Sequence, residues 1–110
     1  MTPNINIDRI HEVLKQWHEA GRATFEQTYT NLDYDSPFYQ KRAVYKTRYV
    51  CLDQGNSGAF LVEMVGEPEK GRKAGNIYRI KSKYGVPNFK KLIGNINTID
   101  GKELSKARWY

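Results

Sequence analysis

The sequence predicts an α+β fold, in which an N-terminal amphipathic helix packs on a small antiparallel sheet of three to four strands, with a short C-terminal helix. Three observations support this prediction. Apolar residues recur at helical spacing within residues 1–32, strand-like runs joined by turns fill residues 43–99, and a capping residue starts the segment 100–110. A chain of 110 residues has the size of a single domain.

The N-terminal helix is predicted from about residue 7 to residue 30. Apolar side chains recur there at steps of three and four residues, and charged residues fall between them, so one face of the helix is apolar. Gly21 lies inside this run, where a glycine can kink or break the helix or let a neighbouring segment approach closely. The apolar positions are Ile7, Ile10, Val13, Leu14, Trp17, Phe25 and Leu32.

The sheet is predicted from three runs of residues that follow a connector over 33–42. The β-branched and aromatic run 43–53 predicts a first strand, with Val44, Val50 and Leu52 on the same face. The more uniformly apolar run 59–65 predicts a central second strand, and the alternating run 76–84 predicts a third. The connections are too short for parallel crossovers, so these strands form an antiparallel meander.

The remaining segments complete the predicted domain. Residues 66–75 contain three glycines, one proline and five charged residues, which predicts an exposed basic loop. A short fourth strand is predicted around residues 92–96, and Asp100 is predicted to cap the C-terminal helix.

Charge is distributed unevenly along the chain. Residues 1–69 carry 7 Lys and Arg against 10 Asp and Glu, a net charge of −3, whereas residues 70–110 carry 11 against 2, a net charge of +9. The sum is the formal net charge of +6. A concentrated positive charge attracts nucleic acids and acidic protein surfaces.

The third predicted strand is the best candidate for a binding surface. Alternation places Arg79, Lys81 and Lys83 on one face and Tyr78 on the other, with two more lysines a few residues later. A row of cations ~6–7 Å apart roughly matches the spacing of backbone phosphates. The same row is also typical of the solvated face of an edge strand, where lysine prevents aggregation. Because alternation separates the aromatic residues from the cations, it argues against a platform for stacking single-stranded bases.

The loop adds three cations flanked by glycines, and it could act as an arm that reaches a groove or a partner, or serve solubility alone. No P-loop pattern is present. The predicted nucleic-acid-binding residues are Arg79, Lys81, Lys83, Lys90, Lys91, Lys70, Arg72 and Lys73.

No residue pattern predicts catalysis, a metal site or a cofactor. His11 and His18 are seven residues apart on the helix, roughly 10 Å, which is too far to share one metal ion, so both are expected at the surface or at a rim. Cys51 is the only cysteine, so no intrachain disulfide forms, and it is expected to be buried. Asp33 and Asp35 could form a paired-acid site, but capping of the Ser36-Pro37 turn is the favoured interpretation.

The sequence predicts a cytoplasmic protein. The start MTPNINIDRI has no basic and apolar leader, no apolar run approaches ~18 residues, and one cysteine is compatible with a reducing compartment.

The chain resembles a known group of proteins in two segments, which are RYVCLDQGNSGAFLVE and GNIYRIKSKYGVPNFKKLIGNI. Over roughly residues 42–96 the chain resembles small accessory proteins of tailed bacteriophages, whose role is not established. These proteins follow an N-terminal helix with a Lys/Arg-Arg-Tyr strand, a small-aromatic strand (here 59–62), a Gly-x-[Val/Ile]-Tyr/Leu strand (here 75–78) and a basic tail (here 90–95). The resemblance has no catalytic motif to transfer, and it implies expression in the cytoplasm of a bacterial host.

Two hypotheses of function follow. The first is a non-enzymatic binding protein whose basic face contacts nucleic-acid phosphates without sequence specificity. The second is an inhibitor or host-takeover factor that docks on an acidic host protein, with a homodimer through a sheet edge as a further option. A membrane partner is not expected.

Overall fold

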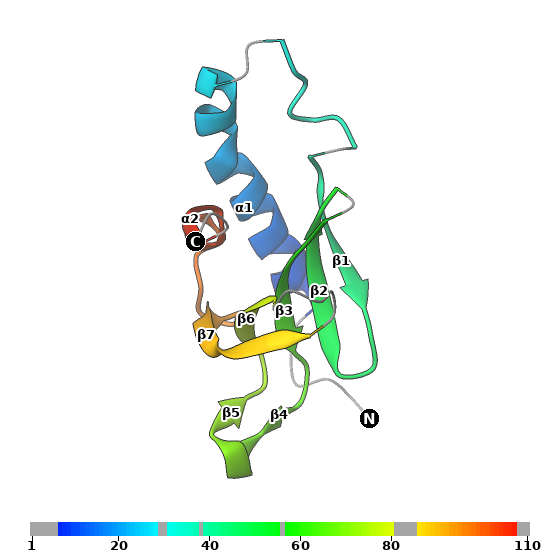
Figure 1. Cartoon of the computed structure of the whole chain (residues 1–110), viewed down its shortest axis with the longest axis vertical. Coiled ribbons are helices and arrows are strands. Elements are labelled where there is room, and N and C mark those ends of the chain that lie inside the picture. Colours follow the sequence, from blue (N-terminus) through cyan, green and yellow to red (C-terminus); the bar gives the residue numbers. More distant parts are fainter. Residues whose placement is uncertain (1–6, 29–30, 38, 56, 81–85, 108–110) are drawn as a thin grey trace.

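A computed structural model of the chain describes residues 7–28, 31–37, 39–55, 57–80 and 86–107, and confirms the α+β fold (Figure 1). The main sheet has five strands, more than the three to four predicted, in the order β1-β2-β3-β6-β7. All neighbouring strands are antiparallel, as the predicted meander requires. The elements are α1 (Ile7–Thr28), β1 (Lys41–Tyr45), β2 (Tyr49–Gln54), β3 (Ser57–Glu63), β4 (Gly66–Glu67), a 3-10 turn (Pro68–Lys70), β5 (Arg72–Lys73), β6 (Asn76–Ile80), β7 (Pro87–Asn95) and α2 (Lys102–Ala107).

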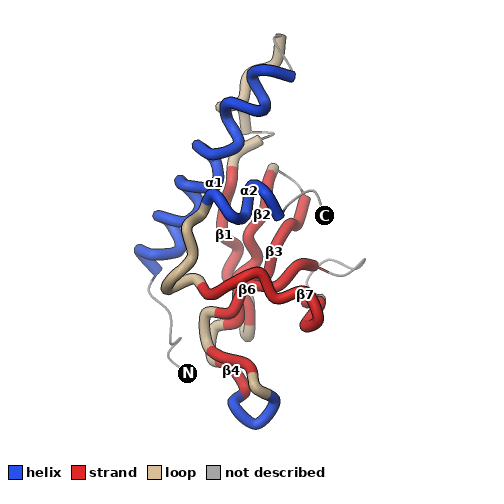
Figure 2. The backbone as a smooth tube through the Cα atoms, turned by 90° about the vertical axis from the view of Figure 1, so that its left-hand side faces the viewer, coloured by secondary structure: helices blue, strands red, loops and turns tan. Residues whose placement is uncertain are grey.

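Helix α1 covers one face of the main sheet, and α2 packs beside it (Figure 2). The predicted apolar stripe of α1 is buried at Ile10, Val13 and Trp17, whereas Ile7 remains 51% exposed. The Trp17 ring meets Phe60 of β3 edge-on, with centroids 5.2 Å apart. The helix continues through Gly21 without a break. No helix in the described part of the chain is long and apolar enough to span a membrane.

The predicted single strand over residues 43–53 is wrong, because this run folds into the hairpin β1–β2. The chain reverses after Tyr45, and the amide of Lys46 donates to the carbonyl of Tyr49 over 2.8 Å. The reversal also changes the predicted faces. Val44 pairs with Cys51, whereas Leu52 pairs with Ala43, so Val44 lies on the face opposite to Leu52.

The predicted exposed loop at 66–75 contains regular structure. Strands β4 and β5 pair through Glu67 and Arg72, and form a small hairpin that projects from the lower end of the molecule in Figure 1. Gly71 lies at its tip with a φ of 73°, a conformation that favours glycine.

Strand β7 starts earlier than the predicted fourth strand and contains an irregularity. Tyr78 of β6 pairs with Leu92, but the next residue, Arg79, pairs with Asn88. Residues 89–91 therefore have no partner on β6 and form a bulge at the edge of the sheet.

The C-terminal helix begins as predicted, because the Asp100 carboxylate accepts a hydrogen bond from the Lys102 amide over 3.1 Å. Gly101 lies directly against α1, where its amide donates to the Gln16 side chain over 2.8 Å. A Cβ atom at Gly101 would stand only 2.4 Å from the Val13 carbonyl oxygen, so the contact between the two helices requires glycine.

Candidate functional site

Three cations of the predicted binding set lie on the last two strands of the main sheet, next to the irregularity in β7. We call Arg79, Lys90 and Lys91 the basic edge. Arg79 is half-buried and lies beside Asn88, while Lys90 and Lys91 are exposed. The Asn88 side chain accepts a hydrogen bond from the Lys90 amide over 3.2 Å and so supports the bulge. None of the three cations has an ion-pair partner among the described residues.

The predicted alternation along β6 holds over the described residues. Arg79 pairs with Phe60 and lies on the face that α1 covers, whereas Tyr78 pairs with Leu61 on the opposite face. Lys81 and Lys83, the other two cations predicted for this strand, lie outside the described residues.

The cations of the β4–β5 hairpin are placed differently from the basic edge. Arg72 contacts Glu63 over 3.3 Å and Glu67 over 2.5 Å, and its side chain is only 14% exposed. Lys70 contacts Glu67 over 3.3 Å. Glu63 and Glu67 thus form ion pairs with two of the three loop cations. Only Lys73 of the three is exposed with no ion pair in the described part of the chain.

Arg72 also connects the hairpin to the basic edge. Its guanidinium lies 3.9 Å from the centroid of the Phe89 ring, and Phe89 in turn meets the Tyr78 ring edge-on at 5.1 Å. The Tyr78 hydroxyl donates to the buried Glu63 carboxylate over 3.4 Å and accepts from Asn76 over 3.1 Å. These contacts therefore hold the Phe89 ring in place, and Lys90 and Lys91 follow it directly in the chain.

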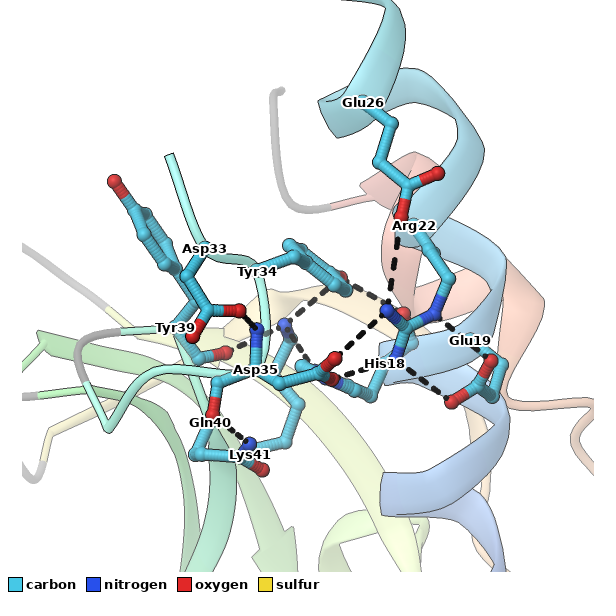
Figure 3. Close-up of polar contacts among 10 residues, drawn as sticks. All are labelled: His18, Glu19, Arg22, Glu26, Asp33, Tyr34, Asp35, Tyr39, Gln40 and Lys41. Carbon is cyan, nitrogen blue, oxygen red and sulfur yellow. Dashed lines mark hydrogen bonds and ion pairs between the residues drawn. The ribbon is translucent and has the colours of Figure 1, made fainter. Parts of the chain in front are cut away.

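A second cluster of polar side chains surrounds His18 on α1, where the connector and β1 meet the helix (Figure 3). We call it the His18 cluster. The Lys41 ammonium donates to His18 Nδ1 over 3.2 Å, to the Tyr34 hydroxyl over 3.1 Å and to the Tyr39 carbonyl over 2.9 Å. Because Nδ1 accepts this bond, the ring proton is on Nε2, which lies 3.3 Å from an Asp35 oxygen.

The Tyr34 ring closes this cluster. It stacks on the His18 ring with centroids 4.3 Å apart, and its hydroxyl donates to the His18 carbonyl over 2.8 Å. A Cβ atom at Gly21 would stand 2.5 Å from the Tyr34 oxygen. Of the three outcomes that the sequence left open at Gly21, the close approach of a neighbour is therefore the one observed.

Burial and ion pairs shift the pKa values of the cluster. Arg22 holds Asp35 through contacts of 2.6 and 3.0 Å, and these bonds lower the pKa of Asp35 to about 2. Burial, opposed by the Asp35 bond, lowers the pKa of His18 below its usual 6.5, and nearby Lys41 and Arg22 lower it further. The lowered pKa favours the neutral form of His18, in which Nδ1 accepts the bond from Lys41.

The structure differs from the sequence-based expectations for His18 and Asp35. His18 was expected at the surface or a rim, but it is 9% exposed. The signal was present, because His18 follows Leu14 by four residues and so continues the apolar stripe of α1. Asp33, not Asp35, caps the turn by accepting from the Asp35 amide over 2.9 Å. The expected burial of Cys51 is confirmed.

An open pocket of about 280 Å³ lies beside the His18 cluster. Lys41 reaches it with its three donor positions directed at the three acceptors above, which makes Lys41 a structural cation. No group of His, Cys, Asp and Glu suited to a metal ion occurs among the described residues. The pocket is lined by His11, Leu14, Lys15, His18, Glu19, Gln40 and Lys41.

Comparison with known proteins does not add a relative. No family model matches the chain, and neither a search of curated proteins nor one of solved structures found a match. Function is therefore inferred from the geometry and charge of the side chains.

Proposed function

We propose that the protein is a non-enzymatic binding module that contacts nucleic-acid phosphates through the basic edge. The observation that carries the proposal is the contrast in ion pairing among the cations of the C-terminal part. Arg79, Lys90 and Lys91 have no ion-pair partner among the described residues, whereas Lys70, Arg72, Lys102 and Lys106 each contact a carboxylate.

A cation without an acidic neighbour gains free energy when it binds a phosphate. Its contact with phosphate releases condensed counterions and breaks no internal ion pair. Each phosphate contact contributes about 0.9 to the slope of log affinity against log salt. Three contacts at the basic edge predict a slope of about −2 to −3, and further cations would make it steeper.

The test is the anisotropy of a labelled oligonucleotide titrated with the protein over a series of salt concentrations. The double substitution Lys90→Gln and Lys91→Gln removes two charges from the basic edge, and is expected to reduce the slope by about 2. The matched control removes two charges from α2 through Lys102→Gln and Lys106→Gln, and is expected to leave the slope nearly unchanged. Equal effects of the two variants, or no binding at low salt, would remove the proposal.

A protein partner is the second candidate, and one observation favours it. Phe89 and Leu92 are 40% and 56% exposed on either side of the two lysines. Exposed apolar residues beside basic ones are typical of a docking surface for an acidic protein. A partner retained from a nuclease-treated host lysate and lost in the Lys90→Gln and Lys91→Gln variant would favour this function. The resemblance of residues 42–96 to phage accessory proteins makes a bacterial lysate the first to use.

A further inference from the structure

We propose that the nucleic acid bound at the basic edge is single-stranded, and that Phe89 stacks on one of its bases. This inference rests on the proposed function and specifies its ligand. The chemical class is a strand with unpaired bases, DNA or RNA, bound without sequence specificity.

Strand β6 separates its aromatic ring from its cation, whereas the bulge in β7 has an exposed ring next to exposed lysines in the chain. On β6, Tyr78 and Arg79 point to opposite faces, so no aromatic ring there shares a face with a cation. In the bulge, Phe89 directly precedes Lys90 and Lys91, and all three residues are exposed. Phe89 and Lys91 are two residues apart, the spacing that places side chains on one face of an extended chain, and an exposed ring beside cations suits single-strand binding.

The Phe89 ring is held in place before any ligand binds. Arg72 lies over the ring and is itself held by Glu63 and Glu67, while the Tyr78 ring meets it edge-on. A side chain fixed in this way loses little rotamer freedom on binding. The residue still exposes 40% of its surface, which leaves room for contact with a base.

Single strands and duplexes differ in what they offer to this surface. Both present phosphates to the cations, but in a duplex the base faces are stacked on one another and are not accessible to Phe89 without unstacking. Preference for a single strand therefore measures the contribution of Phe89 separately from that of the lysines.

The experiment compares full-length wild-type protein with Phe89→Leu on a fluorescent twelve-nucleotide oligothymidine and on a duplex of equal length. Leucine keeps an apolar contact with Tyr78 but has no ring to stack. We expect Phe89→Leu to weaken single-strand binding by about 5- to 100-fold, with little change for the duplex. Leu92→Ala is the matched control, because it removes an exposed apolar side chain without a ring, and it is expected to change neither affinity.

A second variant tests the geometry of the contact directly. In Phe89→Trp, stacking on a base is expected to quench the new indole fluorescence on binding, beyond the change seen for the wild-type protein. Thermal unfolding of each variant checks that it is folded.

The outcomes separate the two proposals. Equal single-strand affinity for wild type and Phe89→Leu would overturn the stacking inference, as would binding of the duplex as tight as that of the single strand. The proposed function would then still stand if Lys90→Gln with Lys91→Gln weakened both. Absence of binding to either nucleic acid at low salt would overturn both proposals, and would leave the protein partner as the function to test.

Discussion

The His18 cluster and the basic edge both combine cations with aromatic rings, but they treat the charge in opposite ways. In the His18 cluster, Lys41 donates to three acceptors and Arg22 contacts the carboxylates of Glu19, Glu26 and Asp35. At the basic edge, no described carboxylate approaches Arg79, Lys90 or Lys91 closely enough for an ion pair.

Formal charge alone is a poor guide to where a polyanion binds. The C-terminal part has a formal surplus of +9, but several of its cations stabilise the fold. A paired cation that turns toward a ligand leaves its carboxylate without a partner, which costs free energy. An unpaired exposed cation has no such cost.

The same substitution in the two regions gives the sharpest contrast. Lys41→Met is expected to lower the free energy of unfolding by about 1–3 kcal/mol, because it leaves three acceptors without their donor. Urea unfolding measures this change. A variant as stable as the wild type would show that solvent satisfies these acceptors equally well, and that the His18 cluster is not closed.

Gly21→Ala disturbs the His18 cluster from the helix side. Alanine favours helix by up to about 1 kcal/mol, but its Cβ would meet the Tyr34 hydroxyl at 2.5 Å, and overpacking typically costs about 1–3 kcal/mol. We expect a net loss of stability of about 1–2 kcal/mol in urea unfolding.

Tyr34→Phe provides the control for Gly21→Ala, since it removes the oxygen that the new methyl group would meet. Its cost should be smaller in the Gly21→Ala background than in the wild type. Strict additivity of the two substitutions would contradict the predicted contact.

Acid should weaken the His18 cluster. The pKa of His18 is lowered in the folded protein, so the unfolded chain takes up the proton first as pH falls. The contribution of His18 to the free energy of unfolding is complete above the unfolded pKa of 6.5. Below that pH it declines, by at most about 1.4 kcal/mol per pH unit. The pKa of Asp35, about 2 against 3.8, adds a loss at lower pH.

Chemical denaturation at pH 7.5 and pH 5.5 tests this dependence. His18→Gln should reduce the difference in stability between the two pH values, because glutamine takes up no proton. An unchanged difference would assign the effect to other groups.

The smallest effect is expected for Lys91→Met at the basic edge. No described group depends on this lysine, so the free energy of unfolding should change by less than about 0.5 kcal/mol. A loss as large as that of Lys41→Met would show that Lys91 is structural, and would remove the distinction between the two regions.

Much of the fold could be predicted because its signals are local. Helical spacing predicted α1, alternation predicted β6, and Asp100 marked the start of α2. The β1–β2 hairpin was missed because residues 46–49, Lys-Thr-Arg-Tyr, contain no glycine, proline or asparagine to mark a turn.

The candidate site was less predictable than the fold. Lys90 and Lys91 were identified from composition, but the role proposed for Phe89 depends on the β7 bulge and on Arg72 from another strand. The partners of His18 lie 17 and 23 residues away along the chain, at Asp35 and Lys41. No spacing rule connects residues that far apart outside a regular element.

The number of charges, their uneven distribution and the periodicities of the helix and strands could all be read from the sequence, because each depends on residues close together in the chain. Folding sets which cations have internal partners and which remain open, and so separates Arg72 and Lys41 from Lys90 and Lys91. An ion pair or a hydrogen bond forms only when two side chains lie within a few ångströms of each other, and that distance is set by folding.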